Sequence, residues 1–109
     1  MKSISALSLA GVVSLALSTV VQAAPAKIWT TWQSTTMSQS QCMHRATAAI
    51  SDLGYDYQVL ESGVYGEFEI LDISVTIRCT TEMGFIFFIA AHPDTDVASQ
   101  ELNALIDAF

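Results

Sequence analysis

Positive charge is scarce in this 109-residue chain, which has four Lys and Arg residues against eleven Asp and Glu residues. The formal net charge is −7 at pH 7, and without Lys2 it becomes 3 − 11 = −8. A field of this sign repels the phosphates of nucleic acids and the anionic headgroups of lipids. We therefore expect no nucleic-acid partner and no binding to a membrane surface.

Sequence motifs for chemistry are also missing. The chain shows no nucleotide-binding loop, no catalytic motif and no pair of cysteines at zinc-site spacing. No Ser, Cys or Lys stands at a recognisable motif spacing from a histidine. The sequence thus predicts no metal and no cofactor, and it leaves open whether the protein is an enzyme.

The first 23 residues have the pattern of a secretory signal peptide. Lys2 precedes an apolar run from Ile4 to Val21, and small residues at Val21 and Ala23 predict cleavage after Ala23. An uncleaved membrane anchor is the alternative, since about 18 apolar residues can span a bilayer, but scattered serines favour cleavage. We expect an exported protein, periplasmic or secreted, whose residues 24–109 form one domain and which does not remain in the membrane.

Cys42 and Cys79 are the only cysteines, and an even pair in a small exported domain predicts a disulfide. Cys42 belongs to a predicted helix that starts at Ser38, where Gln41 completes a capping box. The cysteine lies on the apolar stripe of this helix, and the Cα atoms of a disulfide are about 4.4–6.8 Å apart. Cys79 should therefore lie directly beneath the first turn of the helix.

Hydrophobic periodicity predicts two helices and five β-rich runs. The first helix ends at Gly54, and the second begins after a cap at Asp94 or Thr95 and runs to the C-terminus. The predicted fold is an α+β two-layer sandwich in the order β-α-β-β-β-α, an antiparallel-rich sheet with both helices on one face. By element order it resembles a ferredoxin-like sandwich without its last strand. The β-rich runs are Lys27–Thr36, Tyr55–Glu61, Val64–Ile70, Ile73–Cys79 and Phe85–Ala91, with a bulge or turn near Asp72.

The two tryptophans fall within the first predicted strand. Trp29 and Trp32 are three residues apart, so a regular strand points them to opposite faces. We expect one of them to seal the core and the other to lie outside it.

The hairpin after Asp72 carries an unusual surface. Residues sharing the parity of Cys79 should face the helices, so Ser74, Thr76 and Arg78 should face away. The next strand is apolar at every position from Phe85 to Ala91, so either register exposes large side chains. With a turn over Thr80–Met83 and Cys79 opposite Gly84, the outward residues are Phe85, Phe87 and Ile89; with a three-residue turn they are Ile86 and Phe88.

Such side chains should be covered, because each contributes about 1.5–3 kcal/mol when buried. The candidate covers are the N-terminal segment with Trp29 or Trp32, a second copy of the chain, or another protein. The residues of the predicted interaction face are Thr76, Arg78, Phe85, Ile86, Phe87 and Phe88.

A second candidate site lies where the last strand gives way to the last helix. His92, Asp94 and Asp96 could together bind a divalent cation or act as an acid and base. The two aspartates are equally typical of helix capping and of the positive end of the helix dipole.

Other polar residues have simpler interpretations. His44 is about 200° around the helix from Cys42, so it is expected to be a solvated helix residue. The alternation around Phe68 is typical of a wet sheet face, although a carboxylate cluster can also bind cations or basic partners. The four carboxylates concerned are Glu61, Glu67, Glu69 and Asp72.

Several segments of the chain resemble a group of small exported bacterial proteins of unassigned function. The resemblance implies export and paired cysteines, and it implies no activity, substrate or cofactor. His92 departs from it, because glycine is expected at that position. The segments are Gln41–Met43, Gly63–Glu67, Thr76–Cys79 and Gly84–Ala91.

Taken together, the sequence favours a non-enzymatic exported domain that binds a protein partner or itself. The alternative is a small extracytoplasmic metal-binding protein or enzyme that uses His92, Asp94 and Asp96.

Overall fold

The computed structural model describes residues 25–109. The predicted signal peptide and its cleavage site lie outside the described residues. The elements follow one another as β1 (Lys27–Ser34), α1 (Gln39–Asp52), β2 (Asp56–Val59), β3 (Gly63–Phe68), β4 (Ile73–Thr80), β5 (Phe85–His92) and α2 (Thr95–Ala108). Short 3₁₀ turns join β3 to β4 and β4 to β5.

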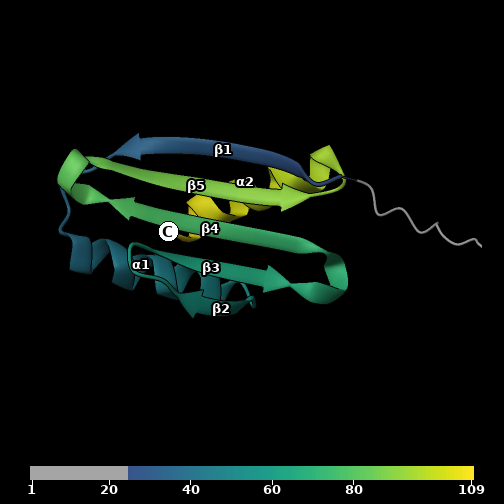
Figure 1. Cartoon of the computed structure of the whole chain (residues 1–109), viewed down its shortest axis with the longest axis horizontal. Helices are drawn as coiled ribbons and strands as arrows, with labels where there is room; N and C mark the ends of the chain where they lie inside the picture. Colours follow the sequence, from purple (N-terminus) through teal and green to yellow (C-terminus); the bar gives the residue numbers. More distant parts are fainter. Residues whose placement is uncertain (1–24) are drawn as a thin grey trace, which may run out of the picture.

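The five strands form one antiparallel sheet in the order β1-β5-β4-β3-β2, as Figure 1 shows. Four strands follow α1, one more than the predicted order β-α-β-β-β-α, because both shorter runs after the helix form strands of their own, β2 and β3. Strands β2 to β5 are a simple meander, while β1 lies at the far edge beside β5. The connection through α1 therefore leads from one edge of the sheet to the other. A ferredoxin-like fold places a single strand between the two strands that its first crossover joins, so the resemblance in element order does not extend to the strand order.

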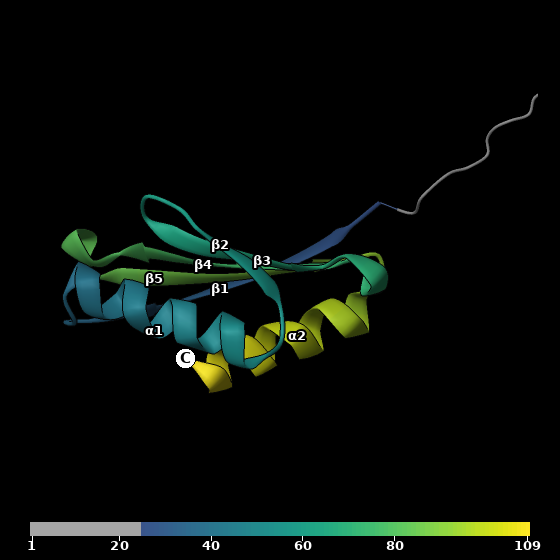
Figure 2. The same cartoon turned by 90° about the horizontal axis from the view of Figure 1, so that it is seen from below.

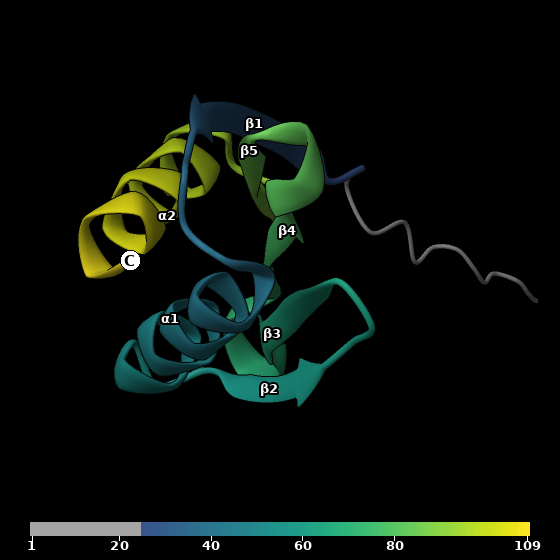
Figure 3. The same cartoon turned by 90° about the vertical axis from the view of Figure 1, so that its left-hand side faces the viewer.

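Both helices pack on the same face of the sheet, which confirms the predicted two-layer α+β sandwich (Figure 2). The end-on view in Figure 3 shows α1 beneath β2 to β4 and α2 beneath β1 and β5. The core lies between these layers and consists of apolar side chains from α1, α2 and the inner positions of the strands. The opposite face of the sheet, called the outer face below, carries no helix from residues 25–109.

The helix starts agree with the capping residues in the sequence. The Ser38 side chain accepts a hydrogen bond from the Gln41 backbone N–H at 3.1 Å, and Cys42, Ala46, Ala49 and Ile50 are buried as the stripe predicted. The Asp94 carboxylate caps α2 by accepting bonds from the backbone N–H groups of Asp96 at 2.8 Å and Val97 at 3.2 Å.

The disulfide is confirmed. Cys42 and Cys79 are bonded, with their Cα atoms 6.0 Å apart, and both side chains are buried. Gln39 strengthens the same junction, because its Nε2 donates to the Cys79 carbonyl at 2.9 Å and its Oε1 accepts from Thr81 Oγ1 at 2.6 Å. The first turn of α1 is therefore tied to the end of β4 and to the turn that follows it by the disulfide and three hydrogen bonds.

Gly66 permits the close approach of α1 to the sheet. A Cβ atom at this position would lie 2.6 Å from Ile50 Cγ2, 3.0 Å from Tyr55 Cβ and 3.3 Å from Val75 Cγ2. The segment between α1 and β2 is linked to α2 as well, since the Tyr55 hydroxyl donates a hydrogen bond to Glu101.

Two details of the hairpins differ from the sequence prediction. Thr80 extends β4 by one residue and pairs with Phe85, so the turn covers Thr81–Gly84 and Cys79 lies opposite Ile86 rather than Gly84. Gly84 takes the left-handed conformation at φ 84° that this turn requires. The predicted break before β4 is present as a 3₁₀ turn, Glu69–Leu71, that ends in a left-handed Asp72 at φ 59°.

Candidate interaction face

The outer face is built by alternate residues of the strands. The observed register differs from the predicted four-residue turn by two positions, and the side-chain parity therefore stays the same. Phe85, Phe87 and Ile89 consequently lie on the outer face. Ile86 and Phe88, which the three-residue turn would expose, are instead 1% exposed beneath the helices and are not part of this face.

Strand β1 adds side chains of its own to the outer face. In the register of β1 with β5, Trp32 lies opposite Phe87 and Thr30 opposite Ile89. The Trp32 ring contacts the edge of the Phe85 ring, with centroids 5.1 Å apart. We call Ile28, Trp32, Phe85, Phe87 and Ile89 the apolar strip.

Much of the apolar strip is open to solvent. Ile28 is 66% exposed, Trp32 58% and Phe87 36%. The N-terminal strand therefore does not cover the hairpin, although Trp32 packs on Phe85. Neither tryptophan seals the core: Trp29 does point to the helix side, as expected from its spacing, but it is 41% exposed.

The rest of the outer face is polar. Thr76 and Arg78 of β4 border the apolar strip, and Arg78 lies directly opposite Phe87. On β3 the Tyr65 hydroxyl donates to Glu67 Oε1 at 3.1 Å, and partial burial together with this acceptor raises the pKa of Tyr65. The outer face thus divides into an apolar half over β1 and β5 and a polar half over β4, β3 and β2.

The residues of the second predicted site have local structural contacts. His92 Nδ1 accepts a hydrogen bond from the Asp94 backbone N–H at 2.9 Å, and Asp94 caps α2. Asp96 is exposed in the first turn of the helix. The His92 and Asp94 side chains therefore shape the turn into α2.

The four carboxylates of the middle strands do not form one cluster. Glu61 lies in the turn between β2 and β3, next to Arg78 and Glu82 in a surface hollow. Glu67, Glu69 and Asp72 line a different, smaller hollow near the turn between β3 and β4. Within residues 25–109, no group of three or more His, Cys, Asp or Glu side chains could hold a metal ion.

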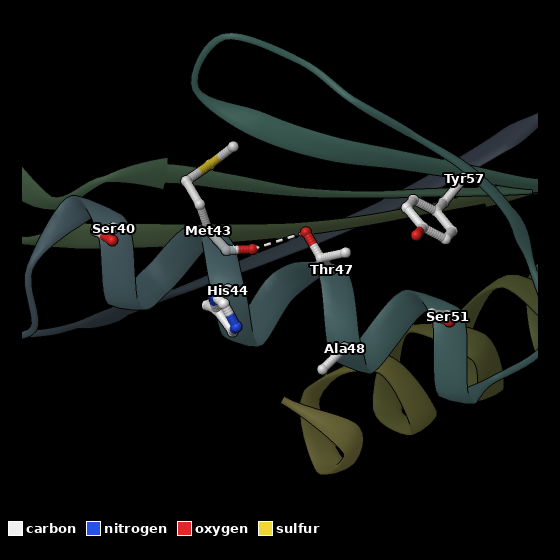
Figure 4. Close-up of a pocket in the computed structure, with 7 residues that line it drawn as sticks. All are labelled: Ser40, Met43, His44, Thr47, Ala48, Ser51 and Tyr57. Atoms are coloured by element: carbon white, nitrogen blue, oxygen red, sulfur yellow. Dashed lines mark hydrogen bonds between the residues drawn. The ribbon is translucent and has the colours of Figure 1, made fainter.

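A shallow groove of about 460 Å³ lies between α1 and β2, and it was not predicted from the sequence. Figure 4 shows Tyr57 of β2 above Thr47 and Ser51, with the His44 imidazole at the surface of α1. The hydrogen bond in the figure joins Thr47 Oγ1 to the Met43 carbonyl at 2.8 Å and belongs to the helix itself. The groove has a mixed lining of hydroxyl, thioether and imidazole groups. Because a helix facing a short edge strand leaves such space, only the packing of α1 could have revealed it.

Comparisons of the chain with protein-family models, curated proteins and solved structures find no match. Among the helices of the described part, none is both long and apolar enough to span a lipid bilayer. The disulfide is consistent with an oxidising, exported location. The functional argument therefore rests on the outer face.

Proposed function

We propose that this protein is a non-enzymatic exported domain that binds another protein through the apolar strip. The observation that carries the proposal is the exposure of Ile28, Trp32 and Phe87 on the same sheet face, which no helix of residues 25–109 covers. Large apolar side chains gathered on one surface are typical of protein interaction sites. Single exposed apolar residues need no such explanation, but Trp32 and Phe87 lie directly opposite each other, and Ile28 lies farther along the same face of β1.

The surroundings of the strip suit a protein partner. Thr76 and Arg78 provide a polar border beside the aromatic side chains, and an apolar centre with a polar rim is the usual anatomy of a protein interface. Aromatic and arginine side chains are also those that contribute most to binding. Burial of Trp32 and Phe87 by a partner would contribute about 1.5–3 kcal/mol for each side chain.

Export is supported by two independent features. Residues 1–23 have the composition of a signal peptide, and the domain contains a buried disulfide, a bond that persists in oxidising compartments. The proposed location of the mature protein is the periplasm or the extracellular medium.

The test is a capture experiment with the oxidised, exported protein. Wild type, Phe87→Glu and Gln58→Glu are immobilised and exposed to periplasmic extract, and the bound proteins are quantified by mass spectrometry. Gln58→Glu is the matched control, since it adds the same charge to the polar half of the outer face. We expect a partner that is retained by wild type and Gln58→Glu and lost by Phe87→Glu.

Circular dichroism establishes that each variant is folded. If Phe87→Glu does not fold, Phe87→Ser replaces it, because the smaller neutral side chain removes the apolar ring without adding a charge beside the sheet. Equal capture by all three proteins would overturn the proposal.

A further inference from the structure

The two edges of the sheet differ in how they are protected from other strands. Strand β2, at one edge, has four residues and begins with Asp56. Strand β1, at the other edge, has eight residues and an unbroken register with β5 from Lys27 opposite His92 to Ser34 opposite Phe85. Natural edge strands are usually short, bulged, or interrupted by charge or proline. Strand β1 has none of these features beyond Lys27 at its start.

The hydrogen bonds of the sheet show which backbone groups of β1 are free. The Thr35 N–H donates to the Gly84 carbonyl at 2.9 Å, directly after the last β1–β5 pair. Because bonded and non-bonded pairs alternate in an antiparallel ladder, Gln33, Thr31 and Trp29 direct their backbone groups to β5. The backbone groups of Ile28, Thr30, Trp32 and Ser34 therefore point away from the sheet.

Exposed apolar side chains lie on both faces of this edge strand. Trp29 is 41% exposed on the helix side, while Ile28 and Trp32 are 66% and 58% exposed on the outer face. A protein packed on the outer face would leave Trp29 uncovered. A strand added beside β1 reaches all three side chains, because directly opposite residues have Cβ atoms about 4.5–5.5 Å apart.

The charge distribution allows that added strand to come from a second copy of the chain. The residues from 25 onward contain three Lys and Arg against eleven Asp and Glu, a formal charge of 3 − 11 = −8. None of these carboxylates lies in β1 or β5. Two copies that meet along β1 therefore keep their acidic surfaces away from the contact.

We propose that two copies of this chain associate by antiparallel pairing of β1 with β1, which joins the two sheets into one. A two-fold axis perpendicular to the sheet pairs residues of the same face, and centring it on Thr30 places Ile28 opposite Trp32 of the second copy. The free backbone groups of Ile28, Thr30 and Trp32 then all find partners. Both apolar strips lie on the same side of the joined sheet. The pairing shares Ile28 and Trp32 with the apolar strip but does not use Phe87 of β5, so a variant at Phe87 distinguishes it from the partner proposed above.

The experiment compares sedimentation equilibrium of the oxidised, exported protein with that of two variants. Thr30→Pro removes a backbone N–H that has no partner within the sheet, so it should preserve the fold and abolish the pairing. Thr30→Val retains the N–H and the branched side chain and is the matched control. We expect twice the monomer mass for wild type and Thr30→Val, and the monomer mass for Thr30→Pro.

Two further variants keep the inference testable. If Thr30→Pro fails to fold by circular dichroism, Ile28→Asp replaces it, since this exposed position can carry a carboxylate in the monomer, whereas in the pair the carboxylate would lie against the Trp32 ring of a second acidic copy. Phe87→Glu should remain dimeric, because Phe87 belongs to the face of β5. A monomeric wild type at the highest soluble concentration would overturn the pairing, and so would a dimer that only Phe87→Glu dissociates.

Discussion

Loss of the Cys42–Cys79 disulfide should remove much of the stability of this domain. The bond closes a loop with a sequence separation of 37 residues and connects α1 to β4, two elements in different layers. Reduction leaves both sulfur atoms in the core of the folded protein and removes the constraint that the cross-link places on the denatured chain. The comparison of oxidised with reduced wild type therefore isolates the cross-link from the packing of the side chains.

The magnitude follows from the length of the loop. The chain-entropy relation for a loop of this size gives about 4 kcal/mol at 25 °C. A domain of this length has a free energy of unfolding of about 4–13 kcal/mol. Reduction should thus remove between a third and all of that free energy. The double variant Cys42→Ala/Cys79→Ala should lose more than reduced wild type, because it also removes two buried sulfur atoms.

The assay is urea unfolding of oxidised wild type, reduced wild type and the double variant, followed by tryptophan fluorescence and circular dichroism. The expected result is a lower midpoint for reduced wild type and a still lower midpoint for the double variant. Thiol labelling of the denatured, unreduced protein gives the control for the bond itself. A loss below about 1 kcal/mol on reduction would refute the entropic account, and two free thiols in the exported protein would refute the bond.

Two smaller changes test contacts beside α1, namely the hydrogen bond of Tyr55 and the close approach of Ile50 to Gly66. Tyr55→Phe removes the hydrogen bond to Glu101 and should cost about 1 kcal/mol at neutral pH, measured by urea unfolding. Burial, assisted by the hydrogen bond and charge of Glu101, raises the pKa of Tyr55 in the folded state. The resulting stabilisation is present below the ordinary tyrosine pKa of about 10 and is lost as the pH rises above it. Wild type should therefore lose more stability than Tyr55→Phe on alkaline titration. Equal losses in the two proteins would contradict this explanation. Gly66→Ala should lower the free energy of unfolding by about 1–3 kcal/mol through the contact with Ile50 at 2.6 Å, and an unchanged thermal midpoint would show that the helix can move away.

The faces of the elements could be predicted from the sequence, because periodicity records which side of a helix or strand is buried. Cys42 on a helical stripe and Cys79 on an alternating strand were enough to place the disulfide and the side of the sheet that faces α1. The caps at Ser38 and Asp94 also placed the helix starts. These predictions depend on neighbours within a few residues.

The strand order and the hairpin register could not be predicted in the same way. The alternation of apolar residues in β1 does not indicate that β5 is its partner. Because β1 pairs with β5 at the edge, the ferredoxin-like comparison does not extend to the strand order. The turn is shifted because Thr80 continues the strand, where its Oγ1 donates to the Phe85 carbonyl at 2.8 Å, and because Gly84 supplies the left-handed residue. The prediction that Phe85, Phe87 and Ile89 face outward is still correct, because a register shift of two residues leaves each side chain on the same face of the sheet.

The place of β1 also bears on the order in which the chain folds. Its first pair joins Lys27 to His92, which are 92 − 27 = 65 residues apart, whereas Thr80 and Phe85 in the neighbouring hairpin are 85 − 80 = 5 residues apart. Closing the longer loop costs about 2 kcal/mol more in chain entropy. The meander from β2 to β5 can therefore form while β1 is still unattached, and the first strand to be synthesised is the last to enter the sheet. Until β5 is complete, the Trp29 and Trp32 side chains have no sheet to pack on, which makes the newly made chain most vulnerable to aggregation at its N-terminal strand.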